Sequence, residues 1–143
     1  MRTLLFIGAS LVARAEFLDI RVVIRDMDCQ PCSENLSGAL KRMRGVEDAS
    51  VDFKAGTVNV KLASQNRLGP EQIWDAIKRV GFTPGATELR VRGSIRNGKL
   101  EVPESGKIFD IEGGAAGENI ELKGTTAPPA DPRTAIRIKI AQR

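Results

Sequence analysis

The stretch "LDIRVVIRDMDCQPCSENLSGALKRM" (residues 18–43) joins two different hydrophobic periodicities through a short segment that contains both cysteines of the chain. Ile20, Val22 and Ile24 alternate with the polar residues Asp19, Arg21 and Arg25, and this period of two predicts a strand with one solvated face. From Leu36 to Met43 the apolar residues recur instead at helical spacing, which predicts an amphipathic helix. The two cysteines are therefore expected at a strand-to-helix junction.

Segments of these two kinds continue to alternate along the chain as far as residue 93. The second predicted helix has Pro70 in its first turn and Gly81 at its end. The order of elements is β-α-β-β-α-β, and such strands and helices bury their apolar faces together when both helices cover one face of an antiparallel sheet. We therefore expect an α+β fold, a ferredoxin-like βαββαβ sandwich over residues 16–93.

The C-terminal third of the chain shows strand patterns only. The dipeptide Asn97-Gly98 is typical of a type I′ hairpin turn, and later alternating segments are separated by glycine-rich and proline-rich loops. Together with a strand at residues 88–95, these segments are too short and too few for two packed sheets. They predict a small all-β, OB-like barrel over residues 94–143 that shares the 88–95 strand with the preceding domain.

The first fifteen residues have the pattern of a secretory signal peptide. A basic Arg2 precedes a short apolar run, and Ala13-Arg14-Ala15 provides an A-x-A cleavage site. The run is about half as long as the ~20 residues of a membrane-spanning helix. With residues 1–15 removed, the mature protein is expected in the periplasm or another extracytoplasmic space; a buried first strand or helix is the alternative interpretation.

The composition excludes several classes of function. The sequence contains no histidine, which removes histidine general bases, Ser-His-Asp triads and imidazole metal ligands. The formal net charge is +4, and without Arg2 and Arg14 it is 4 minus 2, or +2, spread among interspersed acids and bases. Aromatic residues make up only 4% of the chain. A nucleic-acid partner is therefore not expected.

The cysteine pair allows three interpretations: a metal site, a redox couple or two inert buried residues. Cys29 is expected in the loop and Cys32 in the first helical turn, where the helix dipole favours the thiolate. Thiolates select soft ions, and Cu(I) and Hg(II) accept two of them. Four-ligand zinc is excluded because the chain has two cysteines and no histidine. The polar stretch around Pro31 argues against inert burial.

At this point the chain resembles the heavy-metal-associated (HMA) domain family, which includes periplasmic mercury-binding proteins, copper chaperones and modules of metal-exporting P-type ATPases. The resemblance rests on the M-x-C-x-x-C pattern of Met27, Cys29 and Cys32, and covers residues 18–92. It implies that both cysteines bind a heavy-metal ion, Cu(I) or Hg(II), that Met27 anchors the loop and that Phe82 packs beneath the site. It also implies a non-enzymatic monomer that delivers metal to a membrane metal transporter or another acceptor protein.

Two residues depart from the family pattern. Asp26 and Asp28 stand where the family often has Gly and Thr. A carboxylate at Asp28 is a candidate additional ligand that would suit Zn(II) or Cd(II), and zinc- and cadmium-exporting ATPases of the family carry Asp at the matching position. The alternative is that Asp28 is a solvated loop residue. Asp26 is expected to cap or solvate the loop.

The competing function is that of a thiol–disulfide oxidoreductase, in which Cys29 attacks and Cys32 resolves. A thioredoxin-like domain also places C-x-x-C between a strand and a helix. Against it, the α/β part is short, with an end expected near residue 93, and no Trp precedes Cys29.

Overall fold

The computed structural model describes residues 16–64, 66–102, 107–113, 117–131 and 133–140. The expected signal peptide at residues 1–15 lies outside this part of the chain. Among the described residues, no helix combines the length and the apolar character needed to cross a membrane.

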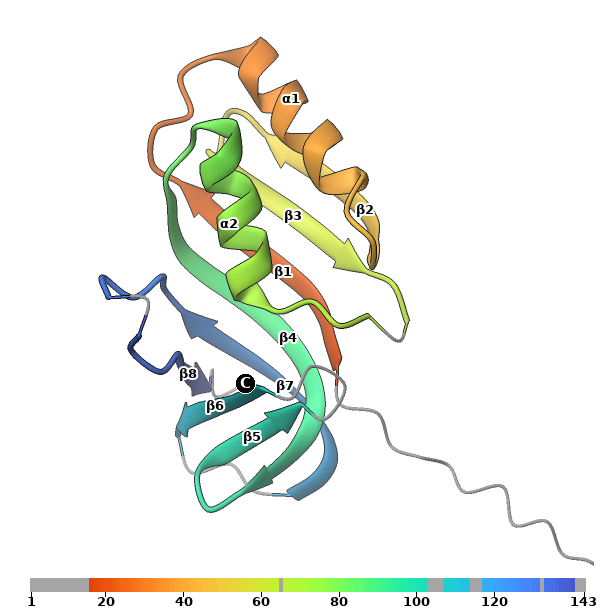
Figure 1. The fold of residues 1–143 in the computed structure, drawn as a ribbon, viewed down its shortest axis with the longest axis vertical. Helices are drawn as coiled ribbons and strands as arrows, with labels where there is room; N and C mark the ends of the chain where they lie inside the picture. The colour runs from red at the N-terminus through yellow and green to blue at the C-terminus, as the bar shows by residue number, and fades with distance from the viewer. Residues whose placement is uncertain (1–15, 65, 103–106, 114–116, 132, 141–143) are drawn as a thin grey trace, which may run out of the picture.

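The first half of the chain has the expected β-α-β-β-α-β order. Its elements are β1 (Glu16–Ile24), α1 (Gln30–Lys41), β2 (Val46–Asp52), β3 (Thr57–Leu62), α2 (Pro70–Val80) and β4 (Pro84–Arg96). The strands form an antiparallel sheet in the order β2-β3-β1-β4. Both helices cover the same face of this sheet (Figure 1). The ferredoxin-like arrangement predicted from the sequence is therefore present.

The sequence pattern predicts a first helix as far as Met43 and a following strand as far as Phe53, and both ends are wrong by a residue or two. The first helix stops at Lys41, because the N–H of Met43 bonds the carbonyl of Leu40 at 3.1 Å in a tightened last turn. Strand β2 stops at Asp52, whose carboxylate accepts the N–H of Ala55 at 3.0 Å. This turn leaves Phe53 outside the strand, with 37% of its surface exposed.

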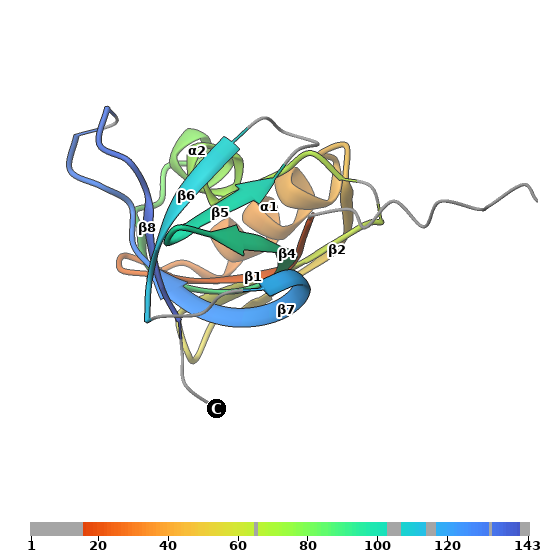
Figure 2. The ribbon, with the colours of Figure 1, turned by 90° about the horizontal axis from the view of Figure 1, so that it is seen from below.

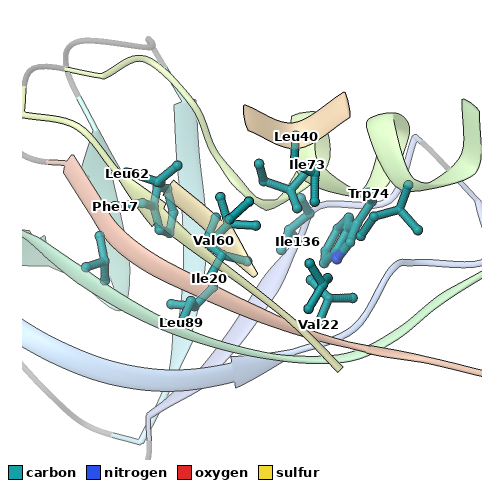
Figure 3. Close-up of a cluster of buried hydrophobic side chains, with 14 of the residues drawn as sticks. Phe17, Ile20, Val22, Leu40, Val60, Leu62, Ile73, Trp74, Leu89 and Ile136 are labelled. Carbon is teal, nitrogen blue, oxygen red and sulfur yellow. The ribbon is translucent and has the colours of Figure 1, made fainter. Parts of the chain in front are cut away.

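The core between sheet and helices is built from the alternating faces that the sequence shows. Apolar side chains of β1, β3 and β4 meet those of both helices (Figure 3). Trp74 of α2 is 3% exposed, and its indole N–H donates to the hydroxyl of Thr87 on β4 at 2.9 Å. The Thr87 hydroxyl in turn donates to the carbonyl of Gly85 at 3.0 Å. Trp74 is thus a fully packed core residue with a satisfied polar atom.

The second half of the chain closes a ring of five strands. Its further elements are β5 (Lys99–Val102), β6 (Lys107–Glu112), β7 (Gly117–Thr126) and β8 (Arg137–Ile140). The ring runs β4-β5-β6-β8-β7, and β7 pairs again with β4 (Figure 2). The pair β6–β8 is parallel and the others are antiparallel. The predicted turn between β4 and β5 is present, with φ of 53° at Asn97 and 71° at Gly98.

Strand β4 belongs to both the sheet and the ring. It pairs with β1 and, further along, with β5 on one edge, and with β7 on the other edge. The two halves also share one hydrophobic cluster. Phe17 of β1 packs edge-on against Phe109 of β6, with ring centroids 5.3 Å apart. The ring closes tightly at Gly124, where an added Cβ would lie 2.6 Å from a side-chain carbon of Ile138.

Candidate metal centre

The two cysteines lie together at the N-terminus of α1, the position that the sequence predicts. Cys29 is the N-cap residue, with extended backbone (φ −131°), and its Sγ accepts the N–H of Cys32 at 3.3 Å. The carbonyl of Cys29 begins the helix by accepting the N–H of Ser33 at 3.1 Å. The Cα atoms of the two cysteines are 5.2 Å apart, and their sulfurs are joined as a disulfide. The fold therefore brings both sulfurs to one point.

This donor set fits a soft ion of low coordination number. After reduction, two thiolates at a helix N-terminus face one position, where the helix dipole and the N–H of Cys32, which donates to Cys29 Sγ, stabilise negative charge. Within the described ranges, no group of three or more Cys, His, Asp or Glu side chains is arranged to hold a metal ion. Two sulfurs alone suit Cu(I) or Hg(II) better than Zn(II), which prefers four ligands.

The structure also places the other residues singled out in the sequence. Met27 is half-buried and packs against the hydrophobic core, and Phe82 is 7% exposed within that core. Asp28 is exposed. Because the described chain offers no third ligand grouped with the cysteines, the structure does not bring the Asp28 carboxylate into a metal-binding cluster.

Sequence reasoning missed one residue that holds this loop. Thr83, which follows α2, donates its N–H to Oδ1 of Asp26 at 2.9 Å and its hydroxyl to Oδ2 at 3.2 Å. Its carbonyl accepts the N–H of Arg25 at 3.2 Å. The segment from β1 to α1 and the segment from α2 to β4 accordingly lie side by side (Figure 1). No short-range pattern in the sequence indicates a contact across 57 positions.

A hollow of about 630 Å³ lies away from the cysteines, on the sheet face opposite the helices. Charged residues from neighbouring strands line it, and several are paired across the sheet. Arg90 forms ion pairs with Asp19 and, at 3.5 Å, with Glu121, which also contacts Arg92 at 3.7 Å. Neither cysteine lines this hollow. We interpret this surface as a solvated sheet face.

Comparison with known protein families agrees with the site. The family model of the heavy-metal-associated domain matches residues 21–83, a segment that includes both cysteines and Thr83. The resemblance inferred from Met27, Cys29 and Cys32 is therefore confirmed. Over residues 21–83 the chain thus matches the heavy-metal-associated domain.

Several solved structures are similar to this chain. A copper-binding domain from HMA7, a P-type ATPase, is 28% identical, and the match spans 50% of this chain and 92% of that domain (TM-score 0.44). The CopZ metallochaperone is 26% identical, and the match spans 46% of this chain and 97% of the metallochaperone (TM-score 0.43). The Cu(I)-loaded N-terminal domain of a potential copper-translocating P-type ATPase from Bacillus subtilis is 22% identical. The match spans 48% of this chain and 85% of that domain (TM-score 0.44). No curated protein matches the chain.

Proposed function

We propose that the protein binds one thiophilic heavy-metal ion through Cys29 and Cys32 and carries it to an acceptor, without catalysing a reaction. One observation carries the proposal: two sulfurs converge at the N-terminus of α1 inside a heavy-metal-associated domain. Cu(I) or Hg(II) is the preferred ion because two thiolates satisfy it. We propose that the protein acts as a monomer and delivers this ion to a membrane metal transporter or another acceptor protein, which can reach the two ligands at the surface loop. The proposal includes no nucleic-acid partner.

The test is copper loading of the same polypeptide in two redox states. Reduced protein is mixed with excess Cu(I), passed through a desalting column and analysed for copper. We expect one ion per chain in the reduced protein and none after oxidation of Cys29 and Cys32, because a disulfide has no thiolate to offer. Equal copper in the two states, or none in the reduced state, would contradict the proposal.

The disulfide in the structure favours one other function, thiol–disulfide exchange. In that case Cys29 would attack a substrate disulfide, and Cys32 would then displace the reduced substrate and re-form the Cys29–Cys32 bond. The discriminating assay is insulin reduction in the presence of dithiothreitol. A metal carrier should not accelerate this reaction above the dithiothreitol blank. Acceleration that is lost in Cys29→Ser would support the oxidoreductase instead.

The Asp28→Ala variant tests the choice of metal. We expect Cu(I) and Hg(II) affinity to change less than about twofold, because the exposed carboxylate is grouped with neither sulfur. If the carboxylate were a ligand, Zn(II) and Cd(II) affinity would fall by about tenfold or more. The measurement is competition among the four ions for the reduced wild-type and variant proteins. A wild-type preference for Zn(II) over Cu(I) would overturn the proposed metal choice.

We further propose that the protein acts in the periplasm or another extracytoplasmic space after removal of residues 1–15. The pattern around Arg2 and the site after Ala15 support this proposal. Intact-mass measurement on protein from its native compartment should give a chain that begins at Glu16. A mass that includes residues 1–15 would place the protein elsewhere.

We assign the remaining chain to two domains, residues 16–93 for metal binding and residues 94–143 for an OB-like barrel that shares strand 88–95. The five-stranded ring supports the barrel assignment. After β6 the chain forms β7, which pairs with β4. The last strand, β8, then inserts between β6 and β7, and this order is a Greek-key path. The two halves share strand β4 and one hydrophobic cluster, so the barrel provides a rigid attachment to the metal domain.

A further inference from the structure

The loop that carries Cys29 is held at nearly every residue between β1 and α1. Arg25 and Asp26 bond Thr83, Met27 packs into the core, and Cys29 caps the helix. Asp26 makes the most specific of these contacts, because its two carboxylate oxygens accept two different donors of one residue. We call this pair of hydrogen bonds the Asp26–Thr83 clasp.

Thr83 is itself a fixed partner. The chain leaves α2 through Gly81, which has φ of 106°, and the N–H of Phe82 donates to the carbonyl of Ile77 at 3.1 Å. Phe82 is buried, and Pro84 begins strand β4. Thr83 therefore stands between a helix cap and a strand, and the clasp ties the metal loop to this rigid segment.

We propose that Asp26 is a positioning residue for the metal ligands, and that the clasp holds Cys29 and Cys32 in the geometry that retains a bound ion. This inference rests on the proposed function. A pre-organised pair of ligands loses less conformational entropy on binding, so a bound ion dissociates more slowly. Without the clasp, the loop gains conformations in which Cys29 has moved away from Cys32.

The proposal makes geometry, rather than charge, the reason for the effect. Asp26→Ala removes both the geometry and the charge. Asp26→Asn removes the charge but keeps an oxygen that can accept the Thr83 N–H and an amide that can donate to its hydroxyl. The matched control is Asp131→Ala, which removes another exposed carboxylate whose Oδ1 accepts a backbone N–H, that of Arg133, at 2.9 Å.

Two measurements are made on each variant. Amide hydrogen exchange at Thr83 in the reduced, metal-free protein reports the clasp itself. The rate of Cu(I) transfer to an excess of a chromogenic chelator reports retention of the ion. Asp26→Ala removes both hydrogen bonds of the clasp, and we expect amide exchange at Thr83 and Cu(I) transfer to become about three- to tenfold faster. The range is modest because the clasp is exposed to solvent.

We expect Asp26→Asn to restore most of the wild-type transfer rate and Asp131→Ala to leave it within about twofold of wild type. If the wild-type protein retains copper and Asp26→Ala transfers it at the wild-type rate, the inference is overturned and the proposed function stays intact. A transfer rate in Asp26→Asn equal to that of Asp26→Ala would also overturn it, because charge would then be the cause. Failure of the wild type to retain copper would overturn the proposed function and the inference together.

Discussion

The double variant Cys29→Ser, Cys32→Ser is expected to lose more than about a hundredfold in Cu(I) affinity. Loss of a residue that only supports a metal ligand costs up to about a hundredfold, and loss of the ligands themselves should cost more. A serine hydroxyl is neutral and hard, so it replaces the volume of a thiol without its affinity for a soft ion. The described chain offers no alternative cluster of ligands near the site. The measurement is competition between the reduced protein and a chromogenic Cu(I) chelator.

The control for this variant is its fold. Both cysteines are only partly buried at the start of α1, and serine is close to cysteine in size, so the variant should unfold at nearly the temperature of reduced wild-type protein. A serine at the N-cap also remains a favourable residue for that position. Equal Cu(I) affinity in the folded variant and the wild type would show that the sulfurs are not the ligands.

The largest effect on stability is expected for Phe17→Ala, with a loss of about 3–5 kcal/mol in the free energy of unfolding. Phe17 is 1% exposed and packs edge-on against Phe109 at the junction of sheet and barrel. Its removal leaves a cavity where strands of both halves meet. Chemical denaturation, followed by the fluorescence of Trp74 and by circular dichroism, measures the change.

The matched control for this prediction is Phe53→Ala, at the turn after β2. Phe53 is 37% exposed, so the same substitution should cost less than about 1 kcal/mol. Because β4 and the core are shared, we expect the two probes to report one transition in Phe17→Ala. Separate transitions, or equal losses in the two variants, would contradict a continuous core.

Much of the fold could be predicted because it depends on local patterns. Alternation from Ile20 to Ile24 defined a strand, and Asn97-Gly98 defined a turn whose two positive φ values the structure confirms. The recurrence from Leu36 to Met43 placed a helix correctly, although its end was set by a hydrogen bond that periodicity does not contain.

What the sequence does not reveal is contact between distant segments. The parallel pairing of β6 with β8 depends on how the ring closes, and no residue in either strand specifies its partner. The hydrogen bond from Trp74 to Thr87 and the Asp26–Thr83 clasp likewise join residues whose separation carries no periodic signal. At the candidate site, the motif named Cys29 and Cys32 but not the residue that holds their loop.

The coordination of copper in the loaded protein tests the central claim most directly. X-ray absorption at the copper edge, measured on reduced protein loaded with one equivalent of Cu(I), reports the kind and number of atoms bound to the ion. The account predicts sulfur ligands only, two per copper, and their disappearance in the Cys29→Ser, Cys32→Ser variant. A copper shell made of oxygen or nitrogen atoms in the wild-type protein would contradict it.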